Sequence, residues 1–269
     1  MALEKEILSM DEAAGLFGVS IKTFIKLLRE ENVPARKIGR EWRFSREALV
    51  DWLAKGNSRT YSSSEQETNR CFEQNTGRWE EISSQYYDYS IINKLVDFDI
   101  LNKDMTVLDY GSGNGFISRG IAPYVGKVIA MDMSCSMLDE LDRKAKLQSI
   151  SNILTVECEE SEIPLRDGRV DLVCASMILH HMHIPKNLMQ EFYRVLKVEG
   201  VLFIADLLPH MDDTFQKSMN DCHMGLNPIA LEQWLLDIGF GNITIEKLPE
   251  TGKGEKNIFV LVAVKVALT

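Results

Sequence analysis

The feature that most constrains the fold is a short apolar run followed at once by a glycine-rich turn. Thr106–Tyr110 has the composition of a strand, residues 111–115 read Gly-Ser-Gly-Asn-Gly, and residues 116–122 are helix-like. A strand, a glycine turn and a helix in this order form a nucleotide-type binding corner, because glycine lets the backbone turn sharply and approach a ligand. Since ordinary turns also contain such glycines, the interpretation depends on the strand that follows.

The second strand supplies an acidic residue at its tip. Residues 128–131 are apolar and lead into Asp132, which lies 23 residues after Asp109. A carboxylate at this place can accept hydrogen bonds from both ribose hydroxyls, and it can also cap the helix expected from residue 134. Phe116 stands where dinucleotide-binding motifs have their third glycine. A ligand without a pyrophosphate, such as S-adenosylmethionine (SAM), therefore fits this corner better.

Four motifs extend this pattern over residues 107–207, in the order VLDYGSGNG, VIAMDMSCSMLDELDRKA, VECEESEIPLRDGRVDLVCASMILHHM and FYRVLKVEGVLFIADLL. They resemble the class I SAM-dependent methyltransferases, in the broad group that includes the ubiquinone and menaquinone enzymes with small-molecule acceptors. The resemblance implies an α/β fold with a Rossmann-like, seven-stranded, mostly parallel sheet and an antiparallel final strand. The remaining strands are expected at residues 155–156, 172–175, 201–206, 243–246 and 259–266.

The same resemblance implies the residues that bind SAM. Asp109 would hold the methionine ammonium, Asp132 the ribose hydroxyls, and Ala175 would offer its backbone carbonyl to the ammonium. Further cofactor contacts are expected from Gly111, Ser112 and Gly113 in the turn, Met133 against adenine, Glu159 at the adenine amino group, and Tyr87 at the methionine carboxylate. Glu159 departs from the family, because Cys-Glu-Glu replaces the usual Gly-Asp-Ala. For Tyr87, within an aromatic stretch expected to form a lid, packing on the sheet edge is the alternative.

The methyl acceptor is less constrained than the cofactor. The fourth strand ends Cys-Ala-Ser-Met and lacks the Asn/Asp-Pro-Pro-aromatic tetrad of amino-methylating DNA enzymes, so a small-molecule acceptor is expected. His181, or else His180, could take a proton from that acceptor. Alternatively, the two histidines are only part of the Leu-His-His run common in the family. No metal site is expected from these histidines and the Cys222-His223 pair.

The N-terminal segment has the pattern of a small DNA-binding domain. Ser9 and Glu12 form a capping-box pair before a short helix, a Gly18 turn follows, and Ser20 precedes a second helix with basic residues on one side. Residues 35–44 form two short strand-like runs, and Ser45 precedes a third helix. Residues 20–46 contain eight basic and three acidic side chains.

This segment resembles the excisionase-type helix-turn-helix domains, relatives of the MerR family. The resemblance implies that the second helix enters the major groove of duplex DNA and that the hairpin contacts the backbone. The implied base contacts are Lys22, Thr23 and Lys26, and the implied phosphate contacts are Arg29, Arg40 and Arg43. The alternative is that the domain only packs on its neighbour or mediates a homodimer.

Charge separates the two expected domains. Residues 1–58 have a net charge of +1, whereas the whole chain of 269 residues has a net charge of −10. We expect a helix-turn-helix domain at residues 1–56, a polar linker at 57–70 and a methyltransferase domain at 71–269. The absence of a long apolar run or a secretory leader, together with five scattered cysteines, predicts a cytoplasmic protein without a membrane partner.

Two functional hypotheses follow. The first is a methyltransferase that acts on a small molecule and has an N-terminal module for binding DNA. The alternative is a DNA-binding transcription regulator whose methyltransferase-like domain senses SAM or a metabolite.

Overall fold

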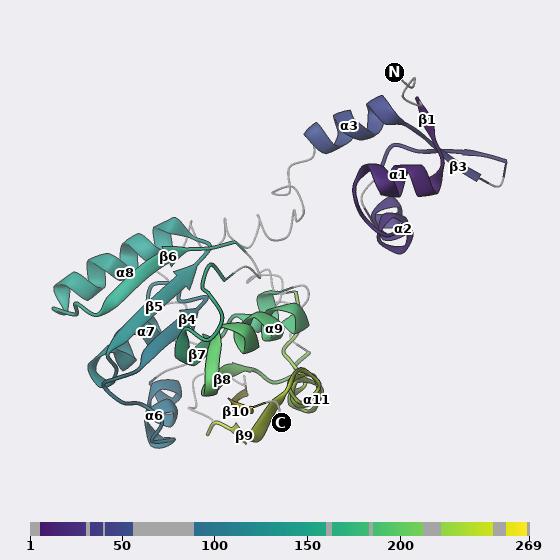
Figure 1. The fold of residues 1–269 in the computed structure, drawn as a ribbon. Helices are drawn as coiled ribbons and strands as arrows, with labels where there is room; N and C mark the ends of the chain where they lie inside the picture. Colours follow the sequence, from purple (N-terminus) through teal and green to yellow (C-terminus); the bar gives the residue numbers. More distant parts are fainter. Residues whose placement is uncertain are drawn as a thin grey trace. The chain divides into compact units, whose positions relative to one another are not determined.

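The computed structural model describes residues 6–30, 33–39, 41–55, 89–159, 163–182, 185–211, 222–249 and 257–267. The chain forms two compact units, Met1–Glu65 and Gln66–Thr269, and each is described by itself (Figure 1). In the described ranges, no helix is both long enough and apolar enough to cross a membrane. The expected linker lies outside the described residues, so the domain limits stay a prediction.

The first unit contains the expected helix-turn-helix and hairpin. Its elements are β1 (Ile7–Leu8), α1 (Met10–Leu16), α2 (Ile21–Glu30), β2 (Arg36–Ile38), β3 (Glu41–Ser45) and α3 (Arg46–Lys55). The strands form an antiparallel sheet in the order β1-β3-β2. The sequence pattern did not predict β1, because two residues are too few to show an alternation.

Side-chain caps fix the ends of these helices. Ser9 and Glu12 form the predicted capping box at α1, and Ser20 Oγ accepts from the backbone N–H of Thr23 at 3.1 Å. Phe24 of α2 packs edge-on against Phe44 of β3 with ring centroids 5.2 Å apart, in the centre of a small core. Ile21 is apolar and lies on the same side of α2 as Phe24, but it is 44% exposed because it lies in the first turn.

The second unit has the expected seven-stranded sheet. Its strands are β4 (Thr106–Tyr110), β5 (Lys127–Asp132), β6 (Ile153–Glu157), β7 (Val170–Ser176), β8 (Leu196–Leu207), β9 (Phe240–Lys247) and β10 (Ile258–Lys265). They lie in the order β6-β5-β4-β7-β8-β10-β9. The final strand β10 runs antiparallel to both β8 and β9, whereas the pairings among β4 to β8 are parallel. This confirms the predicted class I methyltransferase sheet.

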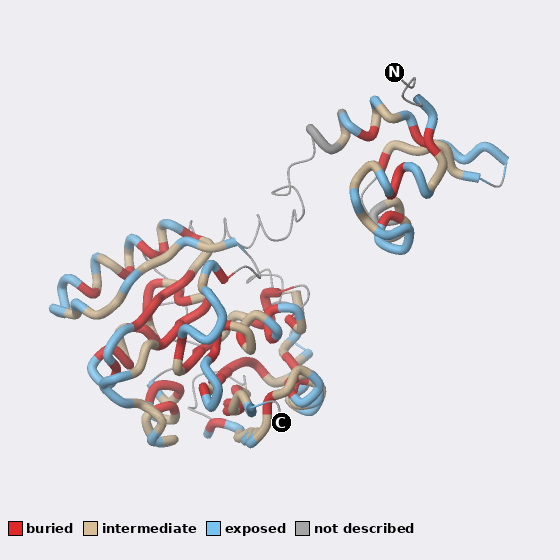
Figure 2. Tube along the Cα trace, viewed as in Figure 1, coloured by how far each residue is buried: buried red, intermediate tan, exposed pale blue. Residues whose placement is uncertain are grey.

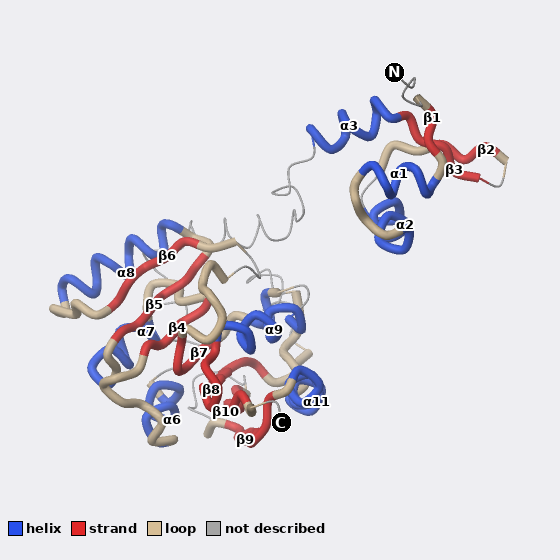
Figure 3. The backbone as a smooth tube through the Cα atoms, in the orientation of Figure 1, coloured by secondary structure: helices blue, strands red, loops and turns tan. Residues whose placement is uncertain are grey.

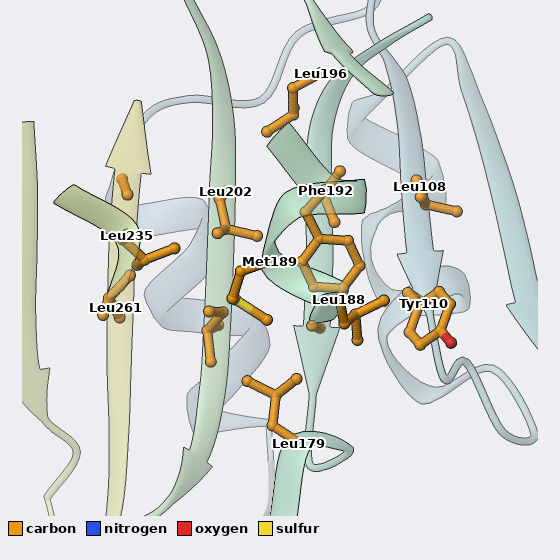
Figure 4. Packing of buried hydrophobic residues seen from close by; sticks show 14 of the residues in the cluster. Leu108, Tyr110, Leu179, Leu188, Met189, Phe192, Leu196, Leu202, Leu235 and Leu261 are labelled. Carbon is orange, nitrogen blue, oxygen red and sulfur yellow. The ribbon is translucent and has the colours of Figure 1, made fainter. Parts of the chain in front are cut away.

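Helices cover both faces of this sheet (Figures 1 and 3). The α-helices are α6 (Ser90–Asp97), α7 (Phe116–Ile121), α8 (Cys135–Leu147), α9 (Pro185–Val195) and α11 (Pro228–Ile238), and η4 (Leu179–His181) is a 3₁₀ turn. Alternate residues of the central strands β4, β5, β7, β8 and β10 belong to two separate apolar clusters, one with α9 and α11 and the other with α6 and α7. Figure 4 shows Phe192 and Met189 of α9 against Leu202 of the sheet. The central strands are consequently the most deeply buried part of the unit (Figure 2).

The order of the strands across the sheet changes direction at β4, which makes β4 the topological switch point. From β4, the strands β5 and β6 continue towards one edge, and β7 and β8 continue towards the other. In open α/β sheets, the crevice at the carboxyl ends of the strands on either side of such a point is where ligands bind. The residues that end β4, β5, β7 and β8 therefore form the candidate site.

Candidate functional site

The glycine turn after β4 is held in a conformation that side chains disfavour. Gly111, Gly113 and Gly115 have φ angles of +68°, +50° and +85°. A Cβ atom at Gly111 would lie 2.5 Å from the side chain of Ile178, whereas one at Gly113 would meet no protein atom within 4 Å. Gly111 and Gly115 are therefore required by packing, and the space beside Gly113 is open to a ligand.

Asp132 connects this turn to the tip of β5. Its Oδ2 accepts from the backbone N–H of Gly113 at 2.7 Å, and its Oδ1 accepts from that of Ser134 at 2.9 Å. Ser134, and not Asp132, is the N-cap of α8. Each carboxylate oxygen can accept a second hydrogen bond, and Asp132 is only half-buried. The remaining lone pairs fit a ribose diol.

Asp109, at the end of β4, is almost completely buried. Its Oδ2 accepts from the hydroxyl of Ser118 on α7 at 2.5 Å. Burial raises the pKa of Asp109 to about 6, the Ser118 hydrogen bond opposes this shift, and the charge of Asp132 adds to it. Burial also raises the pKa of Asp132. Two carboxyl groups that resist ionisation at one corner favour a ligand that brings positive charge.

Two polar atoms of the turn have no hydrogen-bond partner within the described part of the chain. They are Ser112 Oγ and Asn114 Nδ2, both buried. Because buried polar groups are nearly always hydrogen-bonded, these atoms fit a bound ligand. Ser112 was among the predicted cofactor residues, whereas Asn114 was missed. The signal that could have found Asn114 is a polar amide between two glycines of a ligand-binding turn.

For the other predicted cofactor residues that it describes, the structure gives the position but no contact that tests the predicted role. Ala175 is fully buried in β7, where it pairs with Tyr110 and Ile204. Met133 is half-buried after β5, and Glu159 is exposed two residues beyond β6. Tyr87 lies outside the described residues. The roles of these residues stay predictions.

The two predicted histidines follow β7 in η4, and His180 is paired with a carboxylate. His180 Nδ1 lies 2.6 Å from Oδ1 of Asp206 near the end of β8, and both residues are buried. The ring of His181 lies against that of His180, with centroids 4.1 Å apart and the two planes tilted by 43°. Asp206 was missed by sequence reasoning. Its signal is one charged residue near the end of the apolar run at residues 201–207.

The cysteines near the site are poor nucleophiles. Burial, with the negative charge of Asp109, raises the pKa of the Cys174 thiol, and burial raises the pKa of Cys158 to about 12. At neutral pH both thiols are protonated. Among the described residues, no group of three or more His, Cys, Asp or Glu side chains could hold a metal ion.

In the first unit, Lys22 and Thr23 are exposed at the start of α2, and Thr23 Oγ1 lies 2.8 Å from Ser20 Oγ. The side chains of Lys26 and Arg29, and all of Arg40, lie outside what the structure describes. Arg43 donates to the carbonyl of Trp42 and pairs with Glu41. Arg36 lies opposite Arg43 across the β2–β3 hairpin and is exposed, so it is a further cationic residue that sequence reasoning did not single out.

Comparisons with protein families divide the chain in the same way. Residues 108–204 match the family model of a methyltransferase domain, and residues 7–57 match that of a helix-turn-helix domain. The chain therefore contains both predicted domains.

Individual relatives agree with the family matches. An uncharacterised methyltransferase of Schizosaccharomyces pombe is 25% identical over 58% of this chain and 58% of its own length. A ubiquinone biosynthesis O-methyltransferase of Coxiella burnetii is 24% identical over 52% of this chain and 65% of its own length. The chain thus spans less than two thirds of the length of these relatives.

A SAM-dependent methyltransferase from Aquifex aeolicus is a structural relative. Its crystal structure superposes with a TM-score of 0.58 at 25% identity, over 72% of this chain and 98% of that chain. The methyltransferase domain is thus of the SAM-dependent class, and SAM is its cofactor, as predicted. The open space at Gly113, the lone pairs of Asp132 and the unpaired atoms of Ser112 and Asn114 fit this group.

Proposed function

From this domain and its cofactor corner, we propose that the protein transfers the methyl group of SAM to a small-molecule acceptor. The observation that supports the proposal most is the pair Asp109 and Asp132, which end neighbouring strands on either side of the glycine turn. SAM supplies an electrophilic methyl group on a sulfonium. The protein then has to bind, align and desolvate two reactants, and it needs no nucleophile of its own.

Each side chain of the corner has a separate task in this proposal. Asp109 holds the methionine ammonium and becomes ionised as it does so, because a neighbouring positive charge favours the carboxylate. Asp132 accepts from the ribose hydroxyls, and Gly113 admits the ligand to the turn. Ser112 Oγ and Asn114 Nδ2 supply hydrogen bonds to polar atoms of the cofactor.

Turnover tests this proposal. Purified protein is incubated with SAM labelled at the methyl group and a metabolite extract, and the products are separated by chromatography. We expect a labelled small molecule that is absent with Asp132→Ala and present with the surface control Asp139→Ala. SAM binding without any labelled product, in a protein that binds DNA tightly, would instead favour a regulator that senses SAM.

We further propose that the N-terminal domain binds duplex DNA. The supporting observations are the exposed Lys22 at the start of α2 and the exposed Arg36 and Lys37 on the hairpin. Cationic side chains release condensed counterions from phosphates, so the affinity must fall steeply with salt. In this proposal, α2 is the recognition helix that contacts bases in the major groove, and the hairpin contacts the DNA backbone.

Fluorescence anisotropy with a labelled duplex measures this binding. Replacing Lys22 and Lys26 by Ala is expected to weaken binding and to reduce the slope of log affinity against log salt by about 1 for each phosphate that is no longer neutralised. Lys146→Ala, on α8 of the methyltransferase domain, is the control. Identical titrations for the double variant and the wild type would remove α2 from the interface. A homodimer and a cytoplasmic location stay predictions.

A further inference from the structure

Asp206 is positioned to control the imidazole of His180. Its Oδ1 accepts from His180 Nδ1 at 2.6 Å and from the backbone N–H of Leu207 at 2.7 Å. Its Oδ2 accepts from the backbone N–H of Leu179 at 2.9 Å. The carboxylate therefore has three donors while it is completely buried. Backbone groups fix it, so it can in turn fix the ring.

This hydrogen bond determines the tautomer of His180. A carboxylate oxygen that already accepts backbone N–H groups acts as an acceptor, so Nδ1 of His180 carries the proton. Nε2 is then the nitrogen that can take a proton from another group. The pairing has the arrangement of a base oriented by a buried carboxylate.

The pair lies close to the cofactor corner. Ile178, two residues before His180, lies so close to Gly111 that a Cβ atom there would clash. Met177 donates its backbone N–H to the carbonyl of Ala205 at 2.8 Å and has a φ of +55°, so the chain after β7 is bent towards β8. His180 thereby lies at the carboxyl ends of β7 and β8, next to the strand that begins the glycine turn.

The neighbours of His180 define its electrostatic surroundings. The charged or titratable groups that the described residues bring against it are Asp206 from β8, His181 from the same turn, and His223. The backbone N–H of His223 donates to the carbonyl of His180 at 2.9 Å. Asp206 is the anionic group in this set.

We propose that Asp206 is the positioning residue for His180, and that His180 accepts the proton of a hydroxyl-bearing methyl acceptor. This inference rests on the proposed methyltransferase function. An acceptor hydroxyl that gains the methyl group becomes an ether, the sulfonium becomes a neutral thioether, and the hydroxyl proton moves to Nε2 of His180. Asp206 stabilises the imidazolium that results. A neutral amine acceptor already has a lone pair and has less need of this base.

The first experiment determines directly which nitrogen of the imidazole carries the proton, and it needs no methyl acceptor. Nitrogen NMR of histidine-labelled protein, assigned with His180→Gln and His181→Gln, is expected to show His180 protonated at Nδ1. Asp206→Asn should lower the pKa of His180, because it removes the adjacent negative charge. Asp171→Asn is the matched control, since Asp171 also binds a backbone N–H and a cation, at the opposite end of β7. An Nε2-protonated His180, or one that does not respond to Asp206→Asn, overturns the proposal.

The second experiment measures methyl transfer to 3,4-dihydroxybenzoate and to ethanolamine against pH. We expect transfer to the catechol, a loss of 100-fold or more in Asp206→Asn, and a shift of the acid limb to lower pH, with SAM affinity changed by less than about threefold. A lower rate with an unshifted limb, or transfer to the nitrogen of ethanolamine alone, overturns the proposed base. A wild type that binds SAM and methylates neither probe nor any molecule of the metabolite extract contradicts small-molecule methyl transfer itself, and the NMR result then still decides whether Asp206 controls His180.

Discussion

Ser118 donates its hydroxyl proton to Asp109 over 2.5 Å, across the glycine turn that separates β4 from α7. Both side chains are almost completely excluded from solvent. The hydrogen bond stabilises the ionised carboxylate, but burial outweighs it, and the pKa of Asp109 rises to about 6. Without its ligand, the corner therefore holds a carboxyl group that changes charge close to neutral pH.

The first prediction is that SAM affinity depends on pH. The ammonium of SAM binds the ionised form of Asp109, so affinity should be constant above about pH 6.5 and should fall below pH 6, by up to about tenfold per pH unit. Calorimetric titration between pH 5 and pH 7.5 measures this, below the range where the ammonium itself loses its proton. Asp109→Asn should flatten the curve. Equal affinity at pH 5 and pH 7.5 in the wild type would remove Asp109 from the ammonium site.

The second prediction concerns stability without the cofactor. Because the folded pKa of Asp109 lies above its ordinary value of 3.8, the folded protein holds more protons between about pH 4 and pH 6. The contribution of this group to stability is then present below pH 4 and lost as the pH rises through 6, by about 3 kcal/mol. Asn retains an oxygen for Ser118 but cannot ionise.

Urea unfolding of Asp109→Asn and the wild type measures this difference. The variant should gain about 3 kcal/mol relative to the wild type between pH 4 and pH 7.5, while its affinity for SAM decreases. The pH 4 comparison is the internal control, because both side chains are neutral there. A pH-independent difference would mean that Asp109 ionises freely in the folded protein.

The sheet could be predicted from sequence because parallel, buried strands give apolar runs that end at recognisable residues. All five further strands were expected at positions that overlap β6 to β10, and β10 has the predicted antiparallel direction, but the start of β8 at Leu196 lies five residues before the expected one. The exposure of Ile21 was not foreseen, since helical periodicity does not show that the first turn of α2 is left open to solvent.

Only part of the candidate site could be predicted from the sequence. Asp109 and Asp132 follow from the position of each residue at a strand tip. The partnership of Asp206 with His180 joins residues 26 positions apart on different elements, and that of Ser118 with Asp109 depends on how tightly α7 turns back. These hydrogen bonds arise from tertiary packing, to which no local pattern corresponds.

The third prediction tests the ribose contact. Asp132→Ala removes the acceptor of the Gly113 and Ser134 N–H groups as well as that of the ribose hydroxyls. SAM affinity should fall by about 1–3 kcal/mol, or roughly 5- to 150-fold. Equilibrium dialysis measures the change, with Asp139→Ala on α8 as control. Unchanged binding would exclude Asp132 from the ribose site.

The last prediction distinguishes two effects of a substitution at Gly113, namely backbone strain and loss of the space that the cofactor occupies. Gly113→Ala should destabilise the fold by only about 1–2 kcal/mol, because its φ is +50° but a Cβ meets no protein atom within 4 Å. Gly168 is the matched control, since it has a φ of +61° and equally open surroundings in the turn before β7. Both alanine variants should lose similar stability in thermal unfolding, but only Gly113→Ala should weaken SAM binding, by about tenfold or more. Because the two substitutions impose the same backbone strain, a difference in affinity can come only from the methyl group occupying space that the cofactor needs. Equal SAM affinities in the two variants would show that the ligand does not approach the turn at Gly113.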